Sequence, residues 1–411
     1  MDTEMSTPHR SRVARVFEVL TVFLRLGMTS FGGPIAHIGY FRREFVERRR
    51  WLDDKAFTDL VGLCQFLPGP ASSQTGFSIG WLRAGWAGGL AAWCGFTLPS
   101  VLLMLAFAAI APDLGGPFGT GVIHGLKLVA VAVVAQAVWD MARRLCPDRR
   151  RAAIALAAVA LLSFLTTAFA QLIVIAAGAV LGLVLCWTDA GEPARTVAPN
   201  AGHFRVSRPA GVIALIAFCV LLLGLPLPGT SVAAQGVRVF EAFYRSGALV
   251  FGGGHVVLPL LQRETVATGW VAPNVFLAGY GAAQAVPGPL FTFAAFLGWT
   301  MAAPPNHWSG ALLATVGIFL PGLLLVVAAL PWWQALRARP AMASALAGVN
   351  AAVVGLLATA FYSPVWTSAV QSQIDFAIAC LSFFLLTRWR APALVIVVFC
   401  VAAGIAETVL R

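Results

Sequence analysis

Residues 31–34, FGGP, and residues 65–70, QFLPGP, each interrupt an otherwise apolar segment of this 411-residue chain. About 220 residues further on, the two motifs return as FGGG at residues 251–254 and QAVPGP at residues 284–289. Shorter matches, such as Gly-Trp, Leu-Pro and Arg-Glu pairs, keep the same spacing. Matches that stay in register over such a distance indicate an internal duplication. The chain therefore consists of two related halves.

The segments around these motifs have the composition of membrane helices. Apolar residues make up 59% of the chain and charged residues 11%, and the mean hydropathy is +0.83. Soluble proteins carry about 25% charged residues. We therefore predict an all-α polytopic membrane protein with about 10–13 membrane segments, since crossing a bilayer takes roughly 20 apolar residues. The clearest apolar runs are 98–110, 122–138, 152–186, 212–225, 311–330, 341–361 and 391–409.

The positive charge of the chain is distributed as in a membrane protein. The net charge is +11, but the basic residues gather in short loops between apolar runs, for example at 42–50 and 143–151. This is the pattern of cytoplasmic loops, and it does not form a nucleic-acid-binding face. We therefore expect no nucleic-acid partner and a cytoplasmic N-terminus. The first fifteen residues also lack the apolar core and cleavage site of a signal peptide.

No sequence motif points to an enzyme or to a resident cofactor. The seven cysteines have neither CxxC nor Cys/His spacing, so we predict no metal site and no disulfide framework. The sequence has no Walker motif, no Ser-His-Asp arrangement and no Rossmann fingerprint. We therefore predict a protein without catalytic residues and without a cofactor. If the protein moves a solute, ion or substrate gradients or a missing partner would have to drive the movement.

The distribution of charge also predicts how the two halves are oriented. A helix at 209–227 would turn the second half over in the membrane, and the basic loop 42–50 then has the weakly charged counterpart 261–269. An inverted-topology repeat with broken helices and hairpins is a common architecture of secondary transporters. The predicted domains are a cytoplasmic tail, 1–12, a first repeat, 13–187, a cytoplasmic linker plus connecting helix, 188–231, and a second, inverted repeat, 232–411.

The four motifs predict broken helices at membrane depth. Pro-Gly-Pro removes backbone donors and stops a helix from continuing. Such backbone is tolerated in a membrane where it lines a cavity or is buried in protein, and each new helix start favours an anion. Ordinary packing kinks are the alternative interpretation. We predict that the breaks bind substrate through Gly32, Gly33, Pro68, Gly69, Pro70, Gly252, Gly253, Pro287, Gly288 and Pro289.

Charged side chains inside apolar segments are further candidates for the substrate site. Arg25 and Arg245 each lie six residues before an FGG motif. A membrane-embedded Arg is costly unless it is paired or hydrated, and its planar fork suits a tetrahedral oxyanion. An ion pair with Glu18 or Glu241 is the alternative for these arginines. Lys127, whose repeat counterpart is Asn350, is predicted to face the anion or to act as a coupling group, or else to lie at a helix end.

Neutral and protonatable side chains near the breaks complete the predicted site. The neutral residues predicted to bind substrate are Ser30, Gln65, Ser72 and Gln284, with Asn350. The two glutamines could instead cap backbone groups that the breaks leave unpaired. An embedded carboxylate or imidazole can carry a coupling proton, although a lone His is commonly a satisfied core residue. The coupling candidates are Asp59, Glu44, Glu264, His37 and His255.

Residues 29–89, which begin TSFGGPIAHIGYFRREF, closely resemble the signature of the chromate ion transporter family. The segments FGGGHVVLPLL at 251–261 and GAAQAVPGPLFTFAAFLGW at 281–299 resemble that family's second-half version. The resemblance covers residues 15–410 and implies the two-domain, long-chain form. It implies export of chromate across the bacterial inner membrane, driven by the proton motive force, and chromate resistance.

The chemistry of the predicted site leaves the substrate open. Chromate is a tetrahedral dianion close to sulfate in size and shape, and arginine forks and helix N-termini suit both anions. Transport of sulfate or another oxyanion, and passive conduction through an anion channel, are therefore the alternatives. The expected partners are the small oxyanion, protons as the coupling ion and the lipid bilayer. A homodimer is also compatible with this arrangement.

Overall fold

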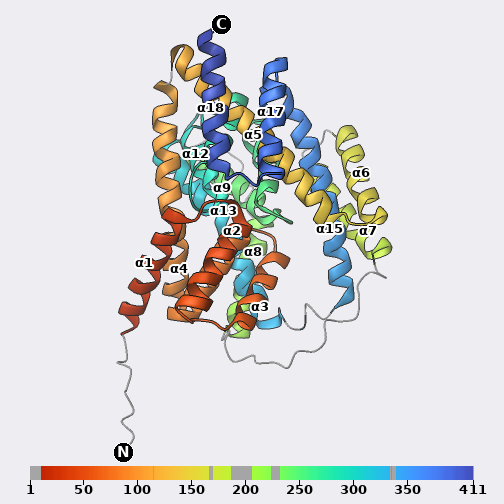
Figure 1. Ribbon diagram of the computed structural model, residues 1–411. Coiled ribbons are helices and arrows are strands. Elements are labelled where there is room, and N and C mark those ends of the chain that lie inside the picture. The colour runs from red at the N-terminus through yellow and green to blue at the C-terminus, as the bar shows by residue number, and fades with distance from the viewer. Residues whose placement is uncertain are drawn as a thin grey trace, which may run out of the picture.

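The computed structural model describes residues 11–113, 115–165, 170–186, 206–223, 232–333, 335 and 339–410, and within these ranges its regular elements are helices (Figure 1). The first half contains α1 Arg12–Thr29, α2 Gly33–Arg42, the π-helical η1 Arg43–Arg48, α3 Asp54–Phe66, α4 Ala71–Ile110, the 3-10 turn η2 Ala111–Asp113, α5 Gly116–Leu145, α6 Arg149–Phe164 and α7 Ala170–Leu185. The connecting helix is α8 Arg208–Leu223. The predicted linker 188–231 lies partly outside the described residues, which omit 187–205 and 224–231.

The second half repeats this order of elements. It contains α9 Val232–Ala248, η4 Gly254–Val256, α10 Val257–Thr265, α11 Pro273–Ala283, η5 Leu290–Thr292, α12 Phe293–Trp299, α13 His307–Ala329, η6 Leu330–Trp332, α15 Pro340–Ala360, η7 Phe361–Trp366, α16 Thr367–Ala369, α17 Gln373–Thr387 and α18 Ala393–Leu410.

The predicted class, an all-α polytopic membrane protein, is confirmed. Four helical stretches are long and apolar enough to cross a bilayer: Ala71–Ile110, Gly116–Leu145, His307–Trp332 and Pro340–Ala369. Shorter apolar helices accompany them, among them α7, α8, α17 and α18. Large apolar side chains such as Phe164, Ile213 and Leu223 are exposed on the outside of the bundle. Such surfaces suit contact with lipid rather than water. The number of spans and the inverted orientation stay predictions.

The predicted helix breaks at the FGG motifs are confirmed. Helix α1 ends at Thr29, and α2 begins at Gly33. Gly32 and Gly33 have φ angles of +100° and +79°, which belong to the left-handed region that glycine adopts without a steric penalty. In the second half, Gly252 and Gly253 have φ angles of +75° and +151°. The sequence FGG is therefore required where the chain reverses between helices.

The predicted breaks at the Pro-Gly-Pro motifs are confirmed as well. Helix α3 ends at Phe66 before the first motif, and α11 ends at Ala283 before the second. The central glycines, Gly69 and Gly288, again have positive φ angles, +116° and +97°. Helix α4 itself has a break in its backbone at residues 84–85, directly after Arg83. Both halves therefore consist of helices interrupted at equivalent points.

The packing of helices is duplicated along with the sequence. In the first half α1 packs on α4, and in the second half α9 packs on α13. Likewise α15 packs on the hairpin of α6 and α7, whereas α5 packs on the hairpin of α17 and α18 (Figure 1). Glycines permit close approach at both contacts, since a Cβ on Gly348 or on Gly125 would lie 2.5 Å from a Cα atom of α7 or α18. Each long inner helix, α5 or α15, is thus held against the terminal hairpin of the opposite half.

Candidate functional site

The breaks of the two halves are joined by a reciprocal pair of hydrogen bonds. The N–H of Gly69 donates to the carbonyl of Val250 over 2.8 Å, and the N–H of Gly288 donates to the carbonyl of Ser30 over 2.8 Å. Ser30 and Val250 each directly precede an FGG motif. Each Pro-Gly-Pro turn is therefore tied to the FGG break of the other half. We call these two bonds the cross-half bonds. In this conformation they occupy two of the backbone donors predicted to meet an anion.

Other backbone groups freed by the breaks are satisfied by polar side chains outside the predicted substrate-binding set. The Nε2 of Gln74 donates to the carbonyls of Pro68 and Gly322, at 2.9 and 3.0 Å. On the other side, the Thr292 hydroxyl donates to the Pro289 carbonyl over 2.8 Å. The bond to the Pro68 carbonyl, which a capping Gln65 could have made, is made by Gln74. The Nε2 of Gln284 donates to the carbonyl of Tyr280, at 3.5 Å.

Two predicted residues from opposite halves, Gln65 and Asn350, meet at one cavity. This inter-half cavity has a volume of about 490 Å³. Its described lining comes from α3, α6, the end of α7 and α15: Gly62, Gln65, Phe66, Arg151, Cys186, Ala343, Ser344, Leu346, Ala347 and Asn350. A Cβ on Gly252 would lie 3.4 Å from the Oδ1 of Asn350, so the second FGG break borders the same region.

Arg151 is the charged side chain in the described lining of the inter-half cavity, and the sequence analysis did not select it. It belongs to the Arg149–Arg151 run, which resembles ordinary cytoplasmic loop charge. The structure instead starts α6 at Arg149, because the side chain of Asp148 accepts the N–H of Arg151 at 2.9 Å. The same carboxylate lies 3.1 Å from the Nε of Arg151. Asp148, an N-cap residue three positions before Arg151, is the sequence feature that could have predicted where Arg151 lies.

The inter-half cavity has the chemistry of an oxyanion site. A guanidinium supplies positive charge and a fork of donors, and the amides of Gln65 and Asn350 supply neutral donors. The hydroxyl of Ser344 is not available as a donor to an anion, because it donates to the carbonyls of Pro340 and Cys186 at 3.0 and 3.3 Å. The described lining contains no carboxylate, but Asp148, outside the lining, pairs with the Nε side of Arg151 and offsets part of its charge.

Arg25 and Arg245 occupy equivalent repeat positions but have different surroundings in the structure. Arg245 makes a bidentate ion pair with Glu264, at 3.0 Å for both bonds, and a further bond of 2.9 Å to Glu241. The carboxylate-pair alternative therefore holds for Arg245. Arg25 is exposed on α1 and has no ion pair within the described part of the chain. The expected partner Glu18 contacts Arg83 and Arg49 instead, at 3.0 and 3.5 Å.

Replacing Arg245 with Gln should lower the free energy of unfolding by about 2 kcal/mol, because two partly buried carboxylates lose their shared cation. The matched control is Arg25→Gln, which removes the repeat counterpart from an exposed position and should change stability by less than about 0.5 kcal/mol. Thermal unfolding of the detergent-purified protein measures both values. Equal melting temperatures for the two variants would contradict the different roles assigned to these arginines.

A second cavity surrounds the Arg245 ion pair. Its volume is about 370 Å³, and its lining includes Arg245, Arg263, Glu264 and Gln171. The pairing of Arg245 with two carboxylates leaves this cavity less suited to a dianion than the inter-half cavity. Lys127 lines neither cavity, because its buried ammonium group donates to the Oδ1 of Asn274 over 2.7 Å. It lies within α5, so the helix-end alternative is wrong.

The two histidines near the breaks have different surroundings. His37 is buried, its Nδ1 lies 3.4 Å from the hydroxyl of Ser72, and its ring packs edge-on against Phe96. The Nδ1 of His255 lies 2.8 Å from the hydroxyl of Tyr280. Both imidazoles are hydrogen-bonded within the core through Nδ1. The Nε2 of His37, however, is buried without a hydrogen-bond partner among the described residues, so the satisfied-core alternative does not hold fully for His37. Their role in proton coupling stays a prediction.

The carboxylate candidates are also engaged. Glu44 on η1 bonds to Arg48 and Arg49, at 3.1 and 2.5 Å. Burial alone raises the pKa of Glu44, but the hydrogen bonds from Arg49 and Arg48 outweigh it and hold the pKa below its usual value. A carboxylate with a lowered pKa is a poor proton carrier near neutral pH. Asp59 is half-buried on α3, and Glu264 belongs to the Arg245 ion pair.

Comparisons with known proteins agree with the sequence motifs. The chain matches the chromate transporter family over residues 17–183 and 237–405. It is 29% identical to a chromate transport protein of Pseudomonas aeruginosa, over 93% of this chain and 90% of that protein. It is 26% identical to a chromate transport protein of Cupriavidus metallidurans, over 92% and 89%. An uncharacterized transporter of Methanocaldococcus jannaschii is 24% identical, over 93% and 92%.

No solved structure gives a significant match to the chain. The family match nevertheless spans both halves and includes all four helix breaks, each of which the structure places at an equivalent point. The predicted family is therefore confirmed: the chain belongs to the chromate transporter family.

Proposed function

We propose that this protein is a secondary transporter, and not an enzyme, that exports chromate from the cytoplasm across the bacterial inner membrane. The observation that carries the proposal is the family match over both halves, together with relatives that are named chromate transport proteins. The proton motive force drives export, and the result for the cell is chromate resistance. The N-terminus lies in the cytoplasm, and the two repeats, 13–187 and 232–411, have opposite orientations.

The inter-half cavity is the proposed binding site for the oxyanion. Arg151 offsets part of the charge of the dianion, while Gln65 and Asn350 donate hydrogen bonds to its oxygens. Arg25, exposed on α1, attracts the anion toward the path. The cavity is far larger than one tetrahedral oxyanion, so the bound anion keeps part of its water shell. This chemistry accepts sulfate as well as chromate, which makes selectivity an experimental question.

The cross-half bonds suggest how the path opens and closes. Because they join a turn of one half to a break of the other, a movement that separates the two halves at these turns breaks them. The Gly69 or Gly288 amide released in this way becomes a donor for the passing anion. An inverted repeat provides two such gates, one facing each side of the membrane.

Uptake of labelled chromate into inverted membrane vesicles tests the proposed function. Energised vesicles containing the protein should accumulate chromate, and an uncoupler should abolish the accumulation. Accumulation that unlabelled sulfate suppresses as well as unlabelled chromate does would favour the broader oxyanion transporter. Equilibration without accumulation, unchanged by the uncoupler, would contradict coupling and favour a passive channel.

A further inference from the structure

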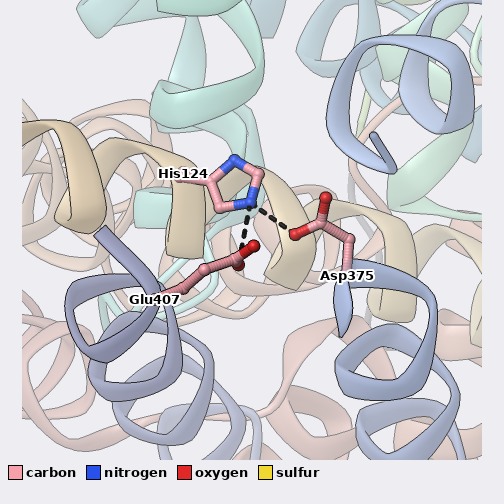
Figure 2. Close-up of side chains that lie close together, drawn as sticks. All are labelled: His124, Asp375 and Glu407. Atoms are coloured by element: carbon pink, nitrogen blue, oxygen red, sulfur yellow. Dashed lines mark hydrogen bonds and ion pairs between the residues drawn. The ribbon is translucent and has the colours of Figure 1, made fainter. Parts of the chain in front are cut away.

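Three side chains far apart in the sequence converge where α5 meets the C-terminal hairpin of α17 and α18 (Figure 2). The Nε2 of His124 lies 2.5 Å from the Oδ1 of Asp375 and 3.8 Å from the Oε2 of Glu407. One ligand atom from each residue lies within 4.8 Å of the others. The side-chain exposures are 18% for His124, 2% for Asp375 and 8% for Glu407. The three form a nearly buried cluster that the proposed function does not use.

The cluster and the inter-half cavity occupy corresponding positions of the duplicated fold, since α5 with α17 and α18 corresponds to α15 with α6 and α7. Asp375 is the third residue of α17 and Arg151 the third residue of α6, the corresponding helix. His124 precedes Lys127 by three residues, just as Ala347 precedes Asn350. Both Arg151 and Ala347 line the inter-half cavity. Asp375 thus corresponds to Arg151, and His124 corresponds to Ala347. With these residues the cluster favours a cation, whereas the inter-half cavity favours an anion.

The backbone holds the cluster in place before any ligand arrives. The Oδ2 of Asp375 accepts the N–H groups of Gln371 and Ser372, both at 2.9 Å, which turns Oδ1 toward the imidazole. The hydroxyl of Ser372 lies 3.4 Å from the Oε1 of Glu407. Close contact of α5 with α18 brings Glu407 to His124, because a Cβ on Gly121 would lie 2.6 Å from the Cα of Ile405. Hydrogen bonds that orient the ligands in this way are typical of metal sites.

The ligating atoms of the cluster and their total charge determine which class of ion it can bind. Two nearly buried carboxylates face one imidazole, and a single imidazolium offsets only one negative charge, whereas a divalent cation offsets both. Ligand atoms about 2.0–2.2 Å from a tetrahedral Zn²⁺ lie roughly 3.3 Å from each other. The distances from the Nε2 of His124 to the oxygens of Asp375 and Glu407, 2.5 and 3.8 Å, lie on either side of this value. One imidazole nitrogen with carboxylate oxygens suits a first-row transition metal better than Ca²⁺.

We propose that His124, Asp375 and Glu407 bind a divalent transition-metal cation of the Zn²⁺ class, with water completing the coordination. The bound cation would fasten the C-terminal hairpin to α5. The inference does not depend on chromate being the substrate, and its test needs no transport measurement.

Calorimetric titration of Zn²⁺ into the chelator-treated, detergent-purified full chain tests this site. We expect one Zn²⁺ per chain and a higher melting temperature with Zn²⁺ than with Ca²⁺. His124→Gln and Glu407→Gln should each weaken Zn²⁺ binding by at least about tenfold, since each removes a direct ligand. Asp375 is left unchanged because it also caps α17.

His307→Gln is the matched control, because this imidazole lies at the start of α13, away from the cluster, and should not affect Zn²⁺ affinity. The absorption spectrum of Co²⁺ bound to the unmutated protein gives a second measurement that needs no variant, and it should show imidazole and carboxylate ligation. Absence of Zn²⁺ binding by the folded protein would overturn the proposal. Equal affinity in the His124→Gln and His307→Gln variants would overturn it too, and would identify the cluster as a structural ion pair.

Discussion

Replacing Arg151 with Gln is expected to reduce chromate transport by about 10- to 100-fold while leaving the amount of folded protein unchanged. Arg151 supplies the charge in the described lining of the inter-half cavity, and Gln keeps a donor but loses that charge. The loss corresponds to about 1.4–2.8 kcal/mol of interaction with a dianion, which is within the range of charge-assisted hydrogen bonds at partly buried sites. Initial rates of uptake into inverted vesicles, normalised to the transporter present, give the measurement.

The neighbouring arginine provides the control for this prediction. Arg149 is the first residue of α6 and is exposed, so Arg149→Gln removes the same charge from the same helix without altering the cavity. Its transport rate should stay within about twofold of the unmutated protein, because exposed charges are screened by salt. Arg151→Lys should keep part of the activity, since it retains charge but loses the planar fork. If Arg149→Gln and Arg151→Gln transport equally well, the cavity is not the anion site.

The sequence was sufficient to predict the helix breaks, because their causes are local. Pro-Gly-Pro and FGG fix backbone geometry within a few residues, and the positive φ angles of Gly32, Gly69, Gly252 and Gly288 follow from that chemistry. The family was also predictable, since its motifs are long and occur in both halves. For the same reason the all-α class followed from composition and the length of the apolar runs.

The partners of charged residues could not be predicted in the same way. Arg25 and Arg245 occupy equivalent positions in the repeat, but Glu264 lies close enough to Arg245 to bind it, and only the folded chain shows this. His124 and Asp375 are 251 residues apart, so spacing in the sequence could not reveal them as a possible ligand set. Arg151 was hidden within a run of arginines. In each case the decisive contact is non-local, whereas the sequence pattern reports only local structure.

The two halves share a backbone plan and differ in the chemistry placed on it. Asn350 borders a cavity, whereas its counterpart Lys127 is buried and bonded to Asn274. Arg151 and Asp375 have opposite charges at corresponding helix starts. A symmetric pair of sites would bind the anion equally well on both faces of the membrane. Of these two corresponding positions, only the one that contains Arg151 has the charge that the proposed anion site needs.

Gly288→Ala is expected to destabilise the protein by about 3 kcal/mol, because Gly288 is confined by both its backbone angle and its neighbours. Its φ of +97° costs an alanine about 1–2 kcal/mol. The new Cβ would lie 3.1 Å from the Cβ of Ser100 and 3.3 Å from the carbonyl oxygen of Phe96. Relieving these contacts moves the amide away from Ser30 and weakens that cross-half bond, at a cost of about 1 kcal/mol.

Gly69→Ala should have a similar effect, because Gly69 has a φ of +116° and its Cβ would lie 3.0 Å from the Cα of Gly322. The control is Gly115→Ala, where φ is −92° and no atom lies within 4 Å of the added Cβ. Melting temperatures in detergent should fall for both cross-half variants and stay unchanged for the control. A Gly288→Ala protein as stable as Gly115→Ala would mean that the halves are not held together at these turns. Both cross-half variants could have lower melting temperatures and also transport less chromate per folded molecule. The same two bonds would then hold the halves together and position the donors that the anion meets.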